Sequence, residues 1–436
     1  MVSGGRRAVA RCDALGVAPY SDMEGGLFRA YLTPAYAAAQ SALAGWMEEA
    51  GMSVRLDPAA NLIGRYEGMV ADAPALMIGS HLDSVKDGGR YDGPLGIMLG
   101  VEAVDALNRE GKRMPFPIEV IAFGDEEGSR FPAAMLTSRA VAGVLDLGAL
   151  EVVDGEGVTL QDAIAHFRHP RLDPGSRFST AAGLGSGTPD QVRGDDYLTA
   201  KHPTALAYLE AHIEQGPVLE AKGLAVGTVT GIAAQLRYQA VVTGQANHAG
   251  TTTMPLRRDA LTGAAEMVLA IETIARGDAS DLVATAGRIE VLPGAPNVIP
   301  GEARFTIDIR SGDPDRRDRA AGQIIAALEA IALARGLTLT VDLIHDLPAS
   351  PCAPDLMDRI DAAIAIVGQP PFRLVSGAGH DAMVMAALCP TAMLFIRCRD
   401  GVSHNPAEHV DPADAEIALQ VMLGFIDRLG DSVAAA

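Results

Sequence analysis

The chain has 436 residues, of which 48% are hydrophobic and 21% charged. This length predicts two or three domains, and the composition is that of a folded protein rather than a disordered one. Asp and Glu outnumber Lys and Arg by 55 to 35, which gives a formal charge of −20. A surface of that charge repels polyphosphate, so we expect no nucleic-acid and no membrane partner.

The cysteines and the N-terminal region indicate in which cellular compartment the protein is expected. The chain has 4 cysteines, and no two of them have C-x-x-C spacing, so we expect free thiols in a reducing environment. Arg11 and Asp13 interrupt the apolar stretch near the N-terminus, which argues against a signal-peptide core. No apolar run reaches the ~18 residues that a membrane helix requires. We therefore expect a soluble, cytoplasmic protein.

The first part of the chain predicts a parallel sheet. An apolar stripe favours a helix over residues 26–50. Two apolar runs, Ala75–Ile78 and Ile118–Phe123, predict buried strands. Between them Pro94 begins a helical stretch, where its missing N–H does no harm. Strand, helix and strand at this spacing predict a βαβ unit and therefore parallel strands.

The second part has a different order of elements. Residues 169–200 are rich in Pro, Gly and Asp and are expected to form a long surface excursion. After residue 225 the patterns predict the order β-α-β-β-α-β, the ferredoxin-like split motif. The expected elements are strands at 236–242, 282–290, 303–310 and 337–344 and helices at 255–275 and 314–335. The chain then returns to helices at 354–367, 380–388 and 412–429, with a strand at 393–396.

This order predicts an α/β fold with an insertion. The larger domain has a mixed, mainly parallel sheet and is expected to comprise residues 1–224 and 349–436. The smaller α+β domain, residues 225–348, is inserted between those two parts.

Polar side chains that could bind a metal ion lie at or near the ends of the predicted strands of the larger domain. In open parallel sheets ligands bind beyond the carboxyl ends of the strands, so these side chains are expected to converge. Three imidazoles and two carboxylates suit Zn²⁺ or a similar ion, and a shared carboxylate would make a two-metal site with ions ~3.5–4 Å apart. The candidates are His81, Asp92, Glu127, His212 and His404.

The residues by themselves leave structural interpretations open. A single histidine at a strand end is more often a hydrogen-bonded loop residue, and Glu126 and Glu127 can form a solvated acidic turn. Against this, the two acids follow a fully apolar strand, where unpaired charge is costly. Asp83 also follows His81 by two residues, where its carboxylate can accept the ring N–H.

A series of motifs extends along nearly the whole chain. They are GSHLDS (79–84), YDGPLG (91–96), DEEGSRF (125–131), HIEQGP (212–217), NHAGT (247–251), SGAGHD (376–381) and SHNP (403–406). In this order they resemble the hydantoinase/carbamoylase branch of the M20 metallopeptidase-like amidohydrolases. That branch includes allantoate amidohydrolases, N-carbamoyl-L-amino acid hydrolases and β-ureidopropionases. Only the segment 169–200 is longer than usual.

The resemblance implies a binuclear centre with two divalent metal ions per subunit. His81 and His212 would hold one ion, Glu127 and His404 would hold the other, and Asp92 would bridge them. Zn²⁺ or Mn²⁺ is expected, with Co²⁺ or Ni²⁺ as further options.

The resemblance also implies an activity. Glu126 would act as general base, taking a proton from the attacking water and passing it to the leaving nitrogen. His212 favours the carbamoyl-amide branch, because the peptidases of the superfamily usually have a carboxylate at that position. We expect hydrolysis of the ureido or carbamoyl C–N bond of a small carboxylate, with release of ammonia and carbon dioxide. Allantoate is the favoured substrate, and an N-carbamoyl-L-amino acid or a β-ureido acid is the alternative.

The inserted domain is implied to be a lid and dimerisation domain of a homodimer. His248 would stabilise an oxyanion, and Asn297 and Arg310 would hold the substrate carboxylate. In this family some lid residues reach the partner's site, and an exposed strand at 236–243 is expected to pair across the two-fold axis. The other implied substrate contacts are Gln215, Gln235 and Gly377. From the residues alone, Arg310 can equally be a surface charge and His248 a solvated side chain.

Two rival functions stay open. A dipeptidase or aminoacylase of the same superfamily is disfavoured by His212, and a non-catalytic metal-binding protein is disfavoured by the free acid Glu126. His380 and His409 are expected to support the site or the structure. The histidines expected at the surface are His166, His169, His202 and His345.

Overall fold

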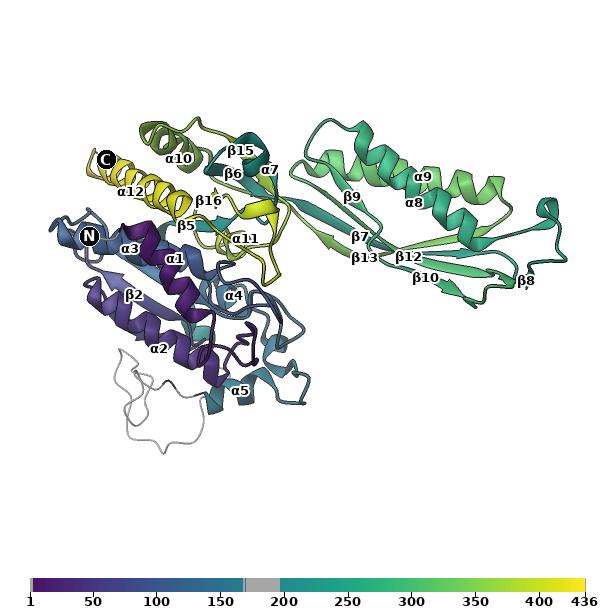
Figure 1. Cartoon of the computed structure of the whole chain (residues 1–436). Helices are drawn as coiled ribbons and strands as arrows, with labels where there is room; N and C mark the ends of the chain where they lie inside the picture. The colour runs from purple at the N-terminus through teal and green to yellow at the C-terminus, as the bar shows by residue number, and fades with distance from the viewer. Residues whose placement is uncertain (1–2, 168, 170–196, 436) are drawn as a thin grey trace. The chain divides into compact units, whose positions relative to one another are not determined.

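The computed structural model describes residues 3–167, 169 and 197–435, and it divides into two compact units (Figure 1). The larger unit comprises Met1–Thr230, Cys352–Leu374 and His380–Ala436, and the smaller unit comprises Gly231–Pro351 and Val375–Gly379. The sequence assigned residues 375–379 to the larger domain instead. They belong to the smaller unit because the Ala233 N–H donates to the Ser376 carbonyl and Arg310 donates to the Gly377 carbonyl.

A nine-stranded mixed sheet begins in the larger unit with β1 and ends with β14. Its central strands β4, β3, β5 and β16 are parallel to one another, and the outer strands β1, β2, β6 and β14 are antiparallel to their neighbours. In spatial order the strands are β1 (Ser53–Leu56), β2 (Leu62–Tyr66), β4 (Ile118–Phe123), β3 (Ala75–His81), β5 (Ala205–Ile213), β16 (Thr391–Ile396), β6 (Val226–Ile232) and β14 (Ser350–Pro351), with β15 (Arg373–Ser376) also paired to β6.

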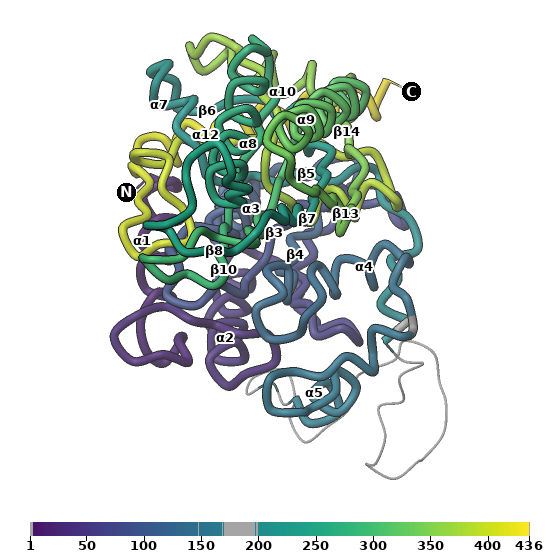
Figure 2. The backbone as a smooth tube through the Cα atoms, turned by 90° about the vertical axis from the view of Figure 1, so that its right-hand side faces the viewer, coloured from purple at the N-terminus to yellow at the C-terminus, as the bar shows by residue number. Residues whose placement is uncertain are grey.

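Helices cover both faces of this sheet. The helices α1 (Gly4–Leu15), α2 (Pro34–Glu49), α3 (Pro94–Arg109) and α12 (Pro412–Ala435) lie on one face, and α4 (Leu136–Ala142) lies on the other (Figure 2). The short helix α11 (Asp381–Met385) packs against α4. Every residue of β3 and β4 is consequently buried, which explains why both strands are apolar over most of their length. The helix α10 (Pro354–Ile366) packs against α12 and β16. The remaining short elements are η1 (Leu147–Glu151), α5 (Leu160–His166), η2 (Leu198–Ala200), α7 (Val218–Lys222) and η4 (Arg399–Gly401).

One helix prediction near the N-terminus requires correction. The helix expected over residues 26–50 begins only at Pro34, where the Thr33 side chain caps it by accepting the Tyr36 N–H. Proline disfavours a helical conformation in the residue before it, so the chain from residue 26 to Thr33 stays irregular. No secondary structure was predicted from the sequence for residues 4–15, which form α1.

The smaller unit contains a five-stranded antiparallel sheet with two helices on one face (Figure 1). The strand order β10-β12-β7-β13 is that of a split β-α-β-β-α-β motif, and β9 also pairs with β12. The elements are β7 (Ala234–Thr243), α8 (Ala260–Gly277), β9 (Val283–Thr285), β10 (Ile289–Leu292), β12 (Glu302–Ser311), α9 (Pro314–Ala334) and β13 (Thr338–Leu347), together with β8 (Asn247–His248), η3 (Met254–Leu256) and β11 (Val298–Ile299).

Two strand predictions in this unit are wrong. The strand expected at 282–290 is divided into β9 and β10, which pair with different parts of β12. The strand at 236–243 was expected to be an edge, but β7 lies between β12 and β13. Its backbone groups are therefore already paired on both sides and are not available to a second copy.

Some residues predicted at the surface are buried. His202 is 8% exposed and its Nε2 lies 3.0 Å from Glu119, and His169 is 2% exposed. His166 and His345 are exposed, as predicted. Most of the excursion expected at 169–200 lies outside the described residues.

The four cysteines are free and buried. Among the residues that the structure describes, no helix combines the length and the apolar composition needed to cross a membrane.

Candidate metal centre

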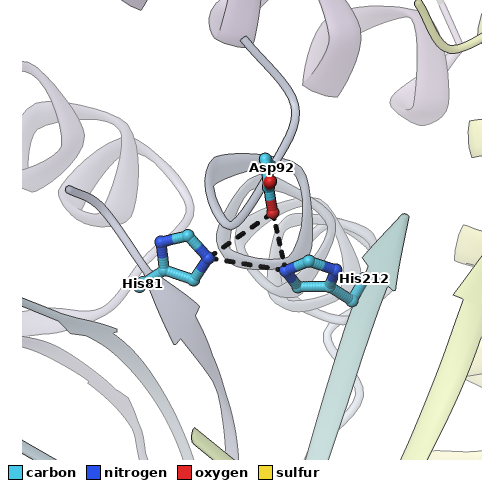
Figure 3. Close-up of side chains that lie close together, drawn as sticks. All are labelled: His81, Asp92 and His212. Atoms are coloured by element: carbon cyan, nitrogen blue, oxygen red, sulfur yellow. Dashed lines mark hydrogen bonds and ion pairs between the residues drawn. The ribbon is translucent and has the colours of Figure 1, made fainter. Parts of the chain in front are cut away.

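The ends of two neighbouring parallel strands bring two histidines together. His81 is the last residue of β3 and His212 lies near the end of β5, and their Nε2 atoms are 3.4 Å apart. Asp92, which precedes α3, completes a buried group: its Oδ1 lies 3.1 Å from His212 Nε2 and 3.6 Å from His81 Nε2. Figure 3 shows the three side chains pointing toward one another.

The chain turns sharply after Asp92 so that its carboxylate can reach both rings. Gly93 has φ +82°, and a Cβ at this position would lie 2.4 Å from the His81 carbonyl oxygen and 2.6 Å from the His81 ring. Only glycine fits this turn. Glu408 fixes the preceding backbone, because its Oε1 accepts the N–H groups of Tyr91 (2.8 Å) and Asp92 (3.1 Å).

The second oxygen of Asp92 belongs to another group. His404 Nε2 lies 3.2 Å from Asp92 Oδ2 and 3.4 Å from Glu127 Oε1. His404 follows β16 and Glu127 follows β4, so four strand ends or the loops after them contribute to the two groups. The carboxylate of Asp92 thus lies between two sets of nitrogen and oxygen atoms, one at each of its oxygens.

Both groups fit a divalent ion. Ligand atoms about 2.0–2.1 Å from a tetrahedral ion lie about 3.3 Å apart, which is close to the 3.1–3.6 Å separations among the His81, Asp92 and His212 atoms. Asp92 Oδ1 is buried and faces the Nε2 atoms of His81 and His212, so a cation between the three atoms would interact with all of them. A third group, Glu210 with His212 and His380, is also close enough, but it shares His212 with the first.

The rings are oriented by backbone carbonyls. His81 Nδ1 lies 3.1 Å from the Asp83 carbonyl oxygen, and His212 Nδ1 lies 2.9 Å from that of Ile213, so each ring directs Nε2 toward Asp92. The sequence predicted that the Asp83 carboxylate receives the His81 N–H. That carboxylate is 3.7 Å away and instead accepts the backbone N–H groups of Glu126 and Glu127, at 3.2 Å each.

The surroundings of the site shift the pKa values of its carboxyl groups in opposite directions. Burial raises the pKa of Glu126 well above its usual value, and the neighbouring Glu127, Asp381 and Asp83 carboxylates raise it further. Burial also opposes ionisation of Asp92, but hydrogen bonds to His212, His404 and His81 outweigh it and hold this pKa well below the usual value. Hydrogen bonds with Asp92 and Glu127 raise the pKa of His404 to about 10. One acid is therefore suited to accepting a proton and another to remaining ionised.

In the smaller unit, the predicted substrate contacts on β7 and β12 lie close together. Arg310 Nε and Nη2 donate to Asp308 at 2.7 and 3.1 Å, and Arg310 Nη1 donates to the Gly377 carbonyl at 2.5 Å. Gln235 Nε2 and Arg237 Nε also donate to Asp308, both at 2.6 Å. We call these five residues the Asp308 cluster. Burial disfavours the charge of Asp308, but its bonds with Arg310 and Arg237 lower its pKa below the usual value.

His248 and Asn297 do not belong to this cluster. Both are exposed, and they are adjacent because β8 pairs with β11 and the Ala249 N–H donates to the Asn297 carbonyl. In the pairing of β12 with β7, Arg310 is opposite Gln235 and Glu302 is opposite Thr243, the strand end from which the chain continues to β8 (Figure 1). Eight residues of strand separate these ends, roughly 26 Å at about 3.3 Å per residue.

Gln215, predicted as a substrate contact, contacts a candidate metal ligand. Its Nε2 donates to Asp92 Oδ2 at 2.9 Å, so it contacts the shared carboxylate directly. The roles of Glu408 and Asp308 were not predicted from the sequence. The available signals were an acid four residues after His404 and an acid two residues before Arg310 on the same face of a strand.

Comparisons with known proteins agree with these features. The model of peptidase family M20/M25/M40 matches residues 77–428. The chain is 41% identical over 405 residues to an N-carbamoyl-L-amino acid amidohydrolase of Geobacillus stearothermophilus, covering 93% of this chain and 94% of the relative. It is 37% identical over 451 residues to an allantoate deiminase of Arabidopsis thaliana, covering 96% and 81%. The structure of a hydantoinase/carbamoylase family amidase from Burkholderia multivorans matches with a TM-score of 0.87 at 33% identity, covering 98% of both chains.

Proposed function

This chain belongs to peptidase family M20/M25/M40, and from that premise we propose that it is a binuclear metal-dependent amidohydrolase that cleaves the carbamoyl C–N bond of a small carboxylate. The observation that carries the proposal is the Asp92 carboxylate, whose two oxygens face two separate sets of histidine and carboxylate ligands. Glu126 lies beside His81 and Glu127 but is not needed as a ligand in either set, which supports a hydrolytic role rather than metal storage.

We propose two ion positions. His81, His212 and Asp92 Oδ1 would hold one ion, and His404, Glu127 and Asp92 Oδ2 would hold the other. Bound there, divalent ions supply a more acidic water and polarise the carbonyl that the water attacks. The mixed imidazole and carboxylate donors suit Zn²⁺ or Mn²⁺.

Proton movement falls to Glu126. Its raised pKa makes its carboxylate a better proton acceptor than an exposed glutamate, and the protonated acid can then donate to the leaving nitrogen. We further propose that His248 stabilises the developing oxyanion and that Arg310, with Asn297, binds the substrate carboxylate.

The smaller unit is proposed to act as a lid and to form a homodimer. Arg310 lies at one end of the β12–β7 pairing, and the chain continues toward His248 from the other end, roughly 26 Å away by the strand spacing. We therefore propose that one small substrate does not contact both residues of the same copy. If both contact substrate, they must come from two copies of the chain. A homodimer therefore follows from the two roles.

Allantoate is the substrate we propose, supported by the relative from Arabidopsis thaliana. N-carbamoyl-L-amino acids are the second candidates, favoured by the 41% identical relative. The test is to load the protein with Zn²⁺ or Mn²⁺, to incubate it with allantoate and a panel of N-carbamoyl-L-amino acids, and to measure ammonia release. A dipeptide panel serves as the control. Release of amino acids from dipeptides without ammonia release from any carbamoyl compound would contradict the proposal.

A further inference from the structure

We propose that Asp308 is a positioning residue that directs one edge of the Arg310 guanidinium to the substrate and sets the charge of the substrate accepted. This inference rests on the proposed role of Arg310 as carboxylate anchor. It adds a residue that determines specificity without contacting the substrate itself.

The cluster lies on one face of the sheet in the smaller unit. Asp308 is opposite Arg237, and Arg310 is opposite Gln235, in adjacent antiparallel strands, so all four side chains project from the same face. The alternate residues Leu236 and Ile309 are buried on the face that packs on the helices. The face that carries the cluster is thus the one left uncovered by α8 and α9 within this unit.

The hydrogen bonds of Arg310 leave N–H groups available on the guanidinium. A guanidinium has five N–H groups, arranged as three edges. Asp308 occupies the edge formed by Nε and Nη2, and the Gly377 carbonyl takes one N–H of Nη1. Each Nη atom keeps one further N–H, so the guanidinium can still donate to a substrate carboxylate.

The charge of the cluster also depends on Asp308. Arg237 and Arg310 contribute two positive charges and Asp308 one negative charge, so the cluster carries one net positive charge. Its cross-strand neighbours on β9 and β13 add no acid: they are Val283, Thr285, His345 and Leu347. One net positive charge matches one carboxylate. Without the Asp308 charge, the two cations would favour a substrate with two carboxylates.

The experiment compares wild type with Asp308→Asn in the metal-loaded protein. For the monocarboxylate substrate that the wild type hydrolyses, the variant is expected to raise KM about tenfold or more with little change in kcat, because Arg310 loses its orientation but the reacting groups do not. N-carbamoyl-L-asparagine and N-carbamoyl-L-aspartate, which have nearly the same size and differ by one charge, are then used as competing ligands. Relative to wild type, Asp308→Asn is expected to change the ratio of their inhibition constants at least about tenfold, in favour of tighter binding of the aspartate compound.

Two further variants keep the test decisive. Asp308→Glu keeps the charge but displaces it by one methylene, so KM rises while the charge preference stays that of wild type; this variant also serves if Asp308→Asn does not fold. Glu302→Gln removes a matched acid that pairs with Arg304 two residues along on the same strand, and it is expected to leave both quantities unchanged.

The outcomes separate this inference from the proposed function. If Arg310→Lys leaves KM unchanged, the carboxylate anchor itself is wrong. If Arg310→Lys raises KM but Asp308→Asn alters neither KM nor the preference for charge, the role of Asp308 is overturned while the anchor stands.

Discussion

Acidic side chains of the larger unit are positioned through the main chain by other acids. Glu408 accepts the N–H groups of Tyr91 and Asp92, and Asp83 accepts those of Glu126 and Glu127. Each contact spans more than forty residues of sequence. A carboxylate that accepts two N–H groups holds the backbone in one conformation, so the side chain that follows has a defined direction.

Replacing Glu126 by glutamine is expected to separate metal binding from turnover. Glutamine has the same shape but cannot take a proton, so the rate should fall by about 10²–10⁴-fold while the fold and the metal content stay the same. Elemental analysis and ammonia release measure the two quantities on one sample. A variant with near wild-type rate would show that Glu126 is not the base.

Replacing Asp92 by alanine is expected to remove both ions together, because its oxygens face both groups of ligands. Replacing His212 by alanine should mainly weaken one ion. Metal content after dialysis, measured side by side for the two variants, checks this difference. Two fully occupied ion positions in a crystal structure of the Asp92→Ala protein would disprove the bridge.

At the scale of elements, the parallel strands bring their carboxyl ends together. A buried acid on one of these strands forms ion pairs with residues of neighbouring elements. Glu119 of β4 accepts a hydrogen bond from Arg65 of β2 at 2.9 Å and lies 3.0 Å from His202, which precedes β5. Burial alone would raise the pKa of Glu119, but His202 and Arg65 outweigh it and lower this pKa to about 2.

This pair predicts a specific sensitivity to acid. The folded-state pKa of Glu119 is below the unfolded value of about 4.3, so its contribution is present above that pH and is lost as the pH falls toward 2. A shift of this size corresponds to about 3 kcal/mol. Urea unfolding at about pH 5 and about pH 3 should therefore show a smaller loss of stability for Glu119→Gln than for wild type.

The matched control for this measurement is Glu67→Gln. Glu67 also pairs with Arg65, at 3.0 Å, but its side chain is 65% exposed. Exposed pairs contribute little, so this variant should follow the wild-type pH dependence. Parallel pH curves for wild type and Glu119→Gln would refute the assignment.

At the scale of the whole molecule, the positions of His248 and Arg310 lead to a test with mixed oligomers. In a dimer of a Glu126→Gln chain and a second inactive chain, one complete site forms only if the residue changed in the second chain acts on the partner's site. Because Arg310 is at one end of the β12–β7 pairing and the chain continues toward His248 from the other end, we expect one of His248→Ala and Arg310→Ala, and not both, to complement Glu126→Gln.

Random mixing should restore about a quarter of the wild-type sites in the complementing pair. Ammonia release from co-expressed chains measures it, and each variant alone is the control. Restoration in both mixtures, or in neither, would contradict the two-copy arrangement.

Much of the larger unit and its candidate site follows from local patterns. Apolar runs between turns predicted β3 and β4, and polar residues at the ends of parallel strands predicted that His81, Glu127 and His404 would meet Asp92 and His212. The motifs predicted the family, which the matches to an N-carbamoyl-L-amino acid amidohydrolase and an allantoate deiminase confirm. These features depend on residues close in sequence and on the general geometry of parallel sheets.

Tertiary structure alone decided the partners of these residues. The sequence did not indicate that β7 is an interior strand, that His202 is buried against Glu119, or that Asp308 holds Arg310. It did not indicate either that Glu408 supports Asp92 across 316 residues. The physical reason is the same in each case: burial and pairing depend on which strands become neighbours and in which register, and residues far apart in the chain carry no local pattern that records this.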